Sequence, residues 1–350
     1  MFSTLAFCKT VESLHLHVRQ GHYLLLVGEK TVFSLETLPS NISCCGAIFP
    51  RIIFETRSFD EGIVVARLEE TTSWSILEAM CDTNGIAIKE ESRAVLALID
   101  GLSYDIECFL ETIFDVLPEK TNIVGAGAGK LTLVQEPVIF DTHRFYENAA
   151  LLFQSPHPMS LGVKHGWEAI VSPLMATKTN AHCLEKINFQ DAFEVYKNAV
   201  EADSSKRFNT MNFFDIAKAY PFGIVRYNKD FIVRDPIFTD GKSITLVGSI
   251  DANSVIALLK GDKNKLIDAA KEATRIASKT ACKEARSCFV VDCISRFLFL
   301  EDTFCEELEA IASCKHPSLP LWGVLSLGEI ANANDEGIEF YNKTCVVCTI

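Results

Sequence analysis

Polar side chains interrupt or end several apolar, strand-like runs in the C-terminal half of the sequence. Arg234 interrupts one run, Arg296 follows a second, and Glu329 lies at the end of a third. An unpaired charge beside apolar strands costs several kcal/mol, so each group must pair with a neighbour, with water or with a ligand. Arginine binds a carboxylate through its planar fork, and glutamate accepts from an amine. We therefore expect a site for an amino acid or another small carboxylate, formed by Arg234, Cys293, Arg296, Glu307, Gly328, Glu329 and Asn342.

The same groups allow two other interpretations. A structural ion pair between Arg296 and a glutamate at a strand end would explain the charges as well as ligand contact would. An enzyme could instead use a thiol or a carboxylate of the same cleft, with Cys293, Glu329 or Glu307 as candidates. The sequence has no G-x-S-x-G elbow and no His-Glu-x-x-His pair, so neither a serine hydrolase nor a zinc peptidase is expected. Binding without catalysis is the leading hypothesis.

A glycine-rich segment at residues 124–130 has only a superficial likeness to a phosphate-binding loop. A P-loop requires glycine where Val124 stands and Ser or Thr where Leu131 stands. Nucleotide motifs of this kind must also open a helix, whereas the residues that follow are strand-like. The glycines are better explained by the close approach of a ligand or a neighbouring strand.

Cysteine usage favours reduced thiols. The sequence has 13 cysteines, an odd number, and most lie in apolar runs. Their share of the chain is well below the roughly 8–10% of disulfide-rich scaffolds. Cys345 and Cys348 have C-x-x-C spacing, but on a strand an offset of three sends the two side chains to opposite faces. We therefore expect free thiols, no structural disulfide and no bound metal.

Composition and charge limit the class of protein. Hydrophobic residues make up 48% and charged residues 23% of the chain, which is typical of a globular protein and excludes disorder. Thirty-three Lys and Arg against 46 Asp and Glu give a net charge of −13, which repels nucleic acids and anionic membranes. No apolar run approaches the ~18 residues of a membrane span, and no signal peptide is evident. The sequence predicts a cytoplasmic protein.

A repeated pattern organises the chain. A strand, a helix, a glycine-bearing strand and two or three further strands recur four times, with the glycines at Gly46, Gly125, Gly223 and Gly323. Such units need partners to bury their apolar faces, so we expect the first two and the last two to pair. The predicted fold class is α/β, with two subdomain pairs and mixed or antiparallel sheets flanked by helices.

The length of 350 residues corresponds to two domains at about 150 residues each. Proline and serine cluster at residues 154–162, which predicts a boundary there and domains over residues 1–160 and 161–350. Apolar residues at helical spacing predict an added helix over residues 263–283, between the third and fourth units.

Short motifs in a fixed order resemble those of FIST proteins (F-box and intracellular signal transduction proteins). In the C-terminal half they are Gly166-Trp167, Phe231-IVRDP, Cys293-ISR, Gly328-Glu329-Ile330 and Phe340-YNKT. In the N-terminal half, Cys45-GAIFP and Val124-GAGAG are similar to the family. The resemblance implies a FIST N-terminal domain in residues 1–160 and a FIST C-terminal domain in residues 161–350.

The resemblance also implies a function. FIST modules are intracellular sensors proposed to bind small ligands such as amino acids, and a chain filled by this module would signal through a separate protein. A histidine kinase, a cyclic-nucleotide component or a chemotaxis component would be such a partner. Some members are similar to haem-binding nitric-oxide sensors. If haem binds here, His165 is the expected axial ligand, because Gly166 permits close approach and Trp167 offers a flat apolar wall.

Overall fold

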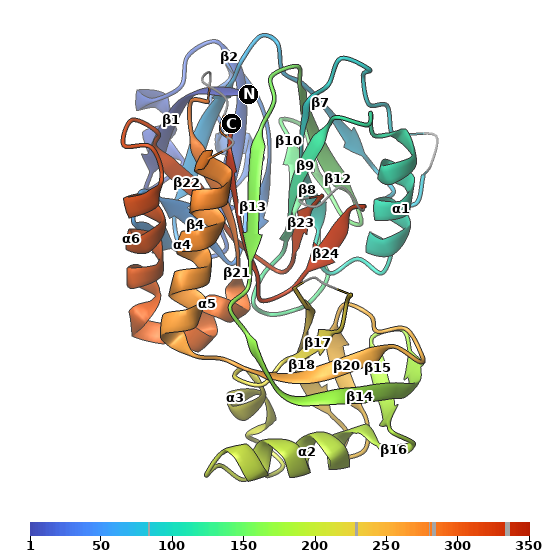
Figure 1. Cartoon of the computed structure of the whole chain (residues 1–350). Coiled ribbons are helices and arrows are strands. Elements are labelled where there is room, and N and C mark those ends of the chain that lie inside the picture. Colours follow the sequence, from blue (N-terminus) through green and yellow to red (C-terminus); the bar gives the residue numbers. More distant parts are fainter. Residues whose placement is uncertain (83–84, 228–229, 280, 282–284, 333–336) are drawn as a thin grey trace.

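The computed structural model describes residues 1–82, 85–227, 230–279, 281, 285–332 and 337–350. It consists of a larger body, to which both ends of the chain contribute, and a smaller domain formed by residues 168–260 (Figure 1). The chain enters the smaller domain from β13 (Ser160–Lys164) and leaves it into helix α4 (Lys263–Lys279), which both belong to the body. The smaller domain is therefore inserted into the chain of the body.

Within the described residues, the body contains three sheets with the same strand order. The first sheet consists of β1 (Phe2–Cys8), β6 (Ile63–Leu68), β2 (Gly21–Gly28), β3 (Ile42–Phe49), β10 (Ile139–Asp141) and β11 (Phe145–Tyr146). The second consists of β7 (Ser73–Leu77), β12 (Ala150–Ser155), β8 (Ala94–Asp100), β9 (Asn122–Ala128), β23 (Glu329–Ala331) and β24 (Glu339–Tyr341). The third consists of β13, β25 (Cys345–Thr349), β21 (Cys288–Cys293), β22 (Leu321–Ser326), β4 (Arg51–Phe54) and β5 (Arg57–Phe59).

The three sheets exchange hairpins in a ring. The two central strands of each sheet are parallel, namely β2 with β3, β8 with β9 and β21 with β22. The hairpin that follows each parallel pair along the chain crosses to another sheet: β4–β5 adds to β22, β23–β24 adds to β9, and β10–β11 adds to β3. None of the three units completes a sheet alone, so segments from both halves of the chain must fold together.

The glycines predicted to be equivalent occupy the same position in three of the four units. Gly46, Gly125 and Gly323 each lie on the second strand of a parallel pair, where a Cβ atom would collide with the partner strand's carbonyl oxygen of Leu25, Ala97 or Val290. Gly223 lies instead between antiparallel strands. The expected pairing of four like units is therefore wrong, because three units form a ring and the third segment in the sequence has its own topology.

That third segment forms the smaller domain. Its strands, all antiparallel, are β14 (Glu168–Asn180), β20 (Val255–Lys260), β17 (Phe222–Ile224), β18 (Ile232–Thr239), β19 (Ile244–Val247), β15 (Cys183–Ile187) and β16 (Gln190–Asp191). Because β14 also pairs with β15, the sheet curls back on itself. Helices α2 (Ala192–Asp203) and α3 (Phe213–Ala217) complete a separate apolar core that includes Tyr196 and Phe222.

Helices cover two of the three sheets of the body. Helix α1 (Ile106–Val116) lies on the second sheet, and α4, α5 (Ile294–Leu300) and α6 (Phe304–Cys314) lie beside the third (Figure 1). Short 3₁₀ turns lie at Glu12–Leu16, Leu35–Thr37 and Glu301–Thr303. In β21, Phe289 and Val291 enter the core shared by the sheets, whereas Cys288 and Val290 pack under the helices. Burial on both faces explains why this strand is a continuous apolar run.

The predicted mixed sheets flanked by helices are thus present, but the finer boundaries differ. Sheets of the body combine strands from both sides of residue 160, and the division into domains 1–160 and 161–350 stays a prediction. Helix α4 ends at Lys279, and residues 280, 282 and 283 of the helix predicted over residues 263–283 lie outside the described residues.

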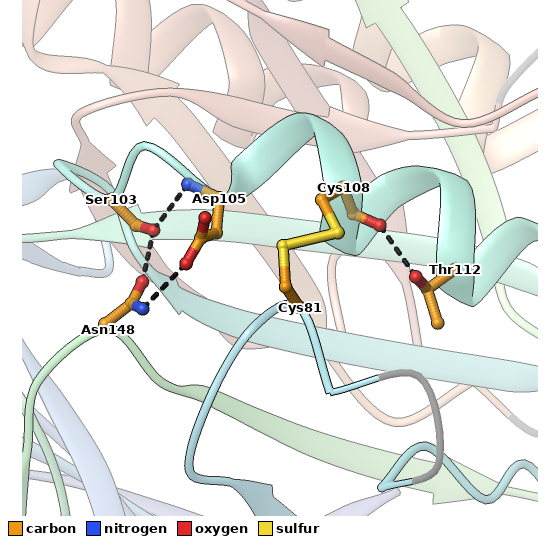
Figure 2. Close-up of a disulfide and its surroundings, with 6 residues drawn as sticks. All are labelled: Cys81, Ser103, Asp105, Cys108, Thr112 and Asn148. Atoms are coloured by element: carbon orange, nitrogen blue, oxygen red, sulfur yellow. Dashed lines mark hydrogen bonds between the residues drawn. A yellow bond between two sulfur atoms is a disulfide. The ribbon is translucent and has the colours of Figure 1, made fainter.

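The expectation that no disulfide forms is wrong at one pair. Cys81 and Cys108 are joined by a disulfide, with their Cα atoms 5.6 Å apart (Figure 2). Cys108 lies in the first turns of α1, and the loop after β7 runs beside this helix and brings Cys81 to it. Sequence spacing gave no sign of the contact because it depends on how the loop packs. Ten other cysteines of the described chain are free thiols, and seven of them are buried in strands: Cys8, Cys44, Cys45, Cys288, Cys293, Cys345 and Cys348.

Candidate functional site

A cleft between the body and the smaller domain contains two adjoining chambers. The outer chamber has a volume of about 610 Å³ and the inner chamber about 290 Å³. Their common wall comes from the loop after β8, the segment after β9, and strands β18 and β19, through Gly101, Leu102, Leu133, Ile237 and Val247. Cavities of this size suit a small organic molecule.

Arg234, predicted as a ligand contact, lines the outer chamber from β18. Its Nε donates to the carbonyl oxygen of Ser249 at 2.7 Å, and its Nη1 donates to that of Phe340 at 3.0 Å. Within the described part of the chain, Nη2 makes no hydrogen bond and the guanidinium has no ion pair. Burial lowers the pKa of Arg234 to about 10, so the group is still charged at neutral pH. The outer chamber therefore contains a fixed cation whose Nη2 can still donate hydrogen bonds to a ligand.

Carboxylates surround this cation without pairing with it. Glu107 and Glu111 come from α1, Glu339 from β24, and Asp251 from the loop after β19. Glu107 accepts from the hydroxyl of Ser249, and Glu339 forms an ion pair with Arg226 at 2.8 Å. The chamber thus presents one positive group and several negative groups to a ligand, which suits a zwitterion.

The inner chamber is apolar except at one end. Its polar lining residues are Asp235, Cys293, Ser295 and Asn342. The Ser295 hydroxyl donates to Oδ2 of Asp235 at 2.5 Å. Asn342 is 1% exposed, and neither its Oδ1 nor its Nδ2 has a hydrogen-bond partner among the described residues. Buried amides are nearly always bonded, so this side chain is the exceptional group of the cleft.

A buried ion pair fixes the polar end of the inner chamber. Lys343 Nζ lies 3.1 Å from Oδ1 of Asp235, and both side chains are almost completely buried. The same ammonium donates to the carbonyl oxygen of Lys218 at 2.9 Å and lies 4.9 Å from the centre of the Trp167 ring. Burial raises the pKa of Asp235, and Lys343 and Ser295 oppose that shift. Lys343 therefore connects the turn before β25 to two elements of the smaller domain.

Arg296 and Glu307 do not line either chamber. Arg296 is fully buried behind the cleft, where Nη2 lies 2.6 Å from Oε2 of Glu307 and Nε lies 3.0 Å from Oδ1 of Asp292. Its other donors reach the carbonyl oxygens of His165 at 2.6 Å and Leu266 at 2.9 Å. All of these partners are structural, since they join α4, α5, α6 and β21. The structural ion pair weighed from the sequence is therefore the arrangement observed for this arginine.

Glu329 lies behind Cys293 and away from the chamber wall. Its carboxyl accepts from the Ser326 hydroxyl at 2.7 Å and from the Thr344 backbone N–H at 3.2 Å. Burial raises the pKa of Glu329 to about 8, against which these hydrogen bonds act. Burial likewise raises the pKa of Cys293 well above its ordinary value. Both groups are mainly protonated at neutral pH.

The structure thus brings together three of the seven predicted residues, Arg234, Cys293 and Asn342, along the cleft. Gly328 packs beneath the ring of Phe340, where a Cβ atom would collide with it. Sequence reasoning missed Asp235 and Lys343 as members of the site. Strand alternation could have identified Asp235. Adjacent residues of a strand point to opposite faces, so Asp235 lies on the other face of β18 from Arg234, where it also needs a partner.

The surroundings of His165 do not fit a haem. Burial lowers the pKa of His165 to about 4, its Nδ1 accepts from the Trp167 backbone N–H at 2.9 Å, and its Nε2 is buried. The adjoining hollow includes Trp167 and Ala269, but most of its lining side chains are charged: Lys164, Glu168, Asp230, Lys265 and Asp268. Gly166 accommodates the backbone of α4, not a ligand. A flat apolar macrocycle has no matching surface at this position.

Among the described residues, no group of three or more His, Cys, Asp and Glu side chains is arranged to hold a metal ion. In the same residues, no helix has the length and apolar character needed to cross a bilayer.

Two family models match the chain. The FIST N domain matches residues 33–190 and the FIST C domain matches residues 192–332. The chain therefore belongs to the FIST family, whose domains are associated with sensing in signal transduction. The two matches meet at β16, inside the smaller domain. No curated protein matches the chain.

Replacing Lys343 by methionine should destabilise the fold strongly. The change leaves the Asp235 carboxylate buried without its counter-charge, which costs about 3–5 kcal/mol for a buried pair. Urea unfolding of Lys343→Met and of the double variant Asp235→Asn/Lys343→Met measures the cost and its partial recovery. Lys178→Met, which breaks the exposed pair with Glu185, is the matched control and should cost about 1 kcal/mol or less. Equal losses for Lys343→Met and Lys178→Met would contradict this account.

Stability should fall with rising pH because of Glu329. Its folded pKa of about 8 lies above the ordinary value of 4.5, so the folded state retains a proton that the unfolded state releases. This contribution is complete below about pH 4.5 and is lost as the pH rises through 8. Between about pH 6 and 9, the wild-type protein should lose about 3 kcal/mol more than Glu329→Gln. Parallel pH profiles from urea unfolding would show that the carboxyl is ionised throughout.

Proposed function

We propose that this protein is a cytoplasmic sensory module that binds a small carboxylate-bearing ligand, such as an amino acid, in the cleft. The observation that carries the proposal is Arg234, a buried guanidinium facing a chamber of about 610 Å³ without a carboxylate partner among the described residues. Charged groups removed from water need a counter-charge. A ligand carboxylate at Nη2 would supply it through a charge-assisted hydrogen bond.

The ligand's amine would be held in the outer chamber rather than by Glu329. Burial keeps Glu329 mainly protonated behind Cys293, so it offers little attraction for an ammonium group. Glu107, Glu339 and Asp251 raise the pKa of Arg234 by their charge, which means that they lie close enough to act on a zwitterion bound there. The sequence-based assignment of the amine to Glu329 is replaced by these three carboxylates.

Signalling would follow from the position of the cleft. The chamber walls come from both the body and the smaller domain, which are joined by two chain segments, one between β13 and β14 and one between β20 and α4. A ligand that contacts both parts favours one relative arrangement of them. A separate protein, such as a histidine kinase or a chemotaxis component, would detect that arrangement.

Catalysis in the same cleft is the weaker candidate. A cysteine nucleophile acts as its thiolate, and burial raises the pKa of the Cys293 thiol well above its ordinary value. The negative charges of Glu329 and Asp235 add to this rise in the pKa of Cys293. Glu307 is held by Arg296 away from the cleft. Chemical turnover of a bound ligand in solution would favour catalysis over binding alone.

Replacing Arg234 by glutamine should weaken ligand binding about 100-fold. The change removes the counter-charge for the carboxylate, a loss of about 3 kcal/mol for a buried charged contact. Thermal-shift screening with L-amino acids and small carboxylates identifies binders, and isothermal titration compares Arg234→Gln with the wild-type protein. Arg275→Gln, on the exposed face of α4, is the matched control and should bind normally. Undiminished binding by Arg234→Gln would place the carboxylate elsewhere.

A further inference from the structure

The inner chamber contains a polar side chain that lacks a partner. Asn342 is 1% exposed, lines this chamber, and leaves both its amide oxygen and its amide nitrogen without a hydrogen bond among the described residues. A buried amide in this state costs about 1–3 kcal/mol for each unmet group. A group that can donate and accept would remove the cost.

The other polar groups of the chamber already have partners. Asp235 pairs with Lys343 and accepts from Ser295, and the thiol of Cys293 is only a weak hydrogen-bonding group. The rest of the wall is apolar and includes Leu102, Phe214, Ile237, Leu298 and Leu327. The chamber therefore suits an apolar segment that ends in one hydrogen-bonding group, placed at Asn342.

The two unsatisfied groups of the cleft are close enough to bind one small molecule. Arg234 donates to the carbonyl oxygen of Phe340, and Asn342 follows two residues later along the chain. Two residues of extended chain span about 7 Å. The chambers share five wall residues, so they adjoin each other. A molecule with its charged end at Arg234 thus reaches Asn342 with a side chain as long as that of tyrosine.

We propose that the cleft selects an amino acid, or a similar zwitterion, whose apolar side chain ends in a hydrogen-bonding group. This inference rests on the proposed function, because it takes the carboxylate to be held at Arg234. Asn342 determines specificity: its amide both accepts from and donates to the terminal group, as a phenol requires. Sites built to satisfy a ligand hydroxyl discriminate strongly against the analogue that lacks it, since the protein group is then left unpaired.

Isothermal titration of the full chain with L-tyrosine, L-phenylalanine and L-alanine tests the inference. L-Tyrosine should bind at least about tenfold more tightly than L-phenylalanine, and L-phenylalanine more tightly than L-alanine because it fills the apolar wall. Asn342→Leu, which keeps the volume, should remove the preference for tyrosine over phenylalanine. The matched control Asn198→Leu, on the exposed face of α2, should keep it. Melting temperatures verify that each variant is folded.

A second variant keeps the test decisive if Asn342→Leu does not fold. Leu298→Trp fills the inner chamber from α5 and should abolish the preference for tyrosine over alanine. Equal binding of the three amino acids, with loss in Arg234→Gln, would overturn this inference and leave the proposed function standing. Binding of none of them, nor of any small carboxylate, would overturn both.

Discussion

The buried contact between Lys343 and Asp235 holds the molecule in its observed form. The ammonium belongs to the turn between β24 and β25 of the body, and its partners, Asp235 and the carbonyl oxygen of Lys218, belong to the smaller domain. Lys343 has φ of +54°, a left-handed conformation that costs energy outside glycine and persists where the surroundings determine it. The same turn positions the two neighbouring residues. Asn342 lines the inner chamber, and the Thr344 N–H donates to Glu329.

The ring of exchanged hairpins explains why the cleft forms where it does. Hairpin β23–β24, encoded near the C-terminus, completes the sheet of β8 and β9 near the middle of the chain. This pairing carries Phe340 and Asn342 to the loops that follow β8 and β9, and the smaller domain closes the other side with β18 and β19. The site therefore depends on three segments that are remote in sequence, and disruption of any one sheet would disturb it.

Local patterns were enough to predict many elements and some of the site. The run at residues 94–100 is a buried strand, the apolar stripe that follows forms α1, and three glycines mark equivalent strands. Arg234 and Asn342 were identified because a polar group within an apolar run must be satisfied. The rest depends on tertiary pairing. The smaller domain has its own strand order, with antiparallel pairing throughout. Arg296 meets Glu307 and Asp292 only after α5 and α6 pack.

Hydrogen–deuterium exchange with and without L-tyrosine tests the central claim most directly, namely that ligand binds between the body and the smaller domain. The account predicts slower exchange in three remote segments together, residues 101–107, 234–251 and 338–342, which border the two chambers. Exchange in residues 164–169, beside His165, should not change. Protection of this last segment alone, or of only one side of the cleft, would contradict the account, because a ligand held as described must contact both parts of the molecule.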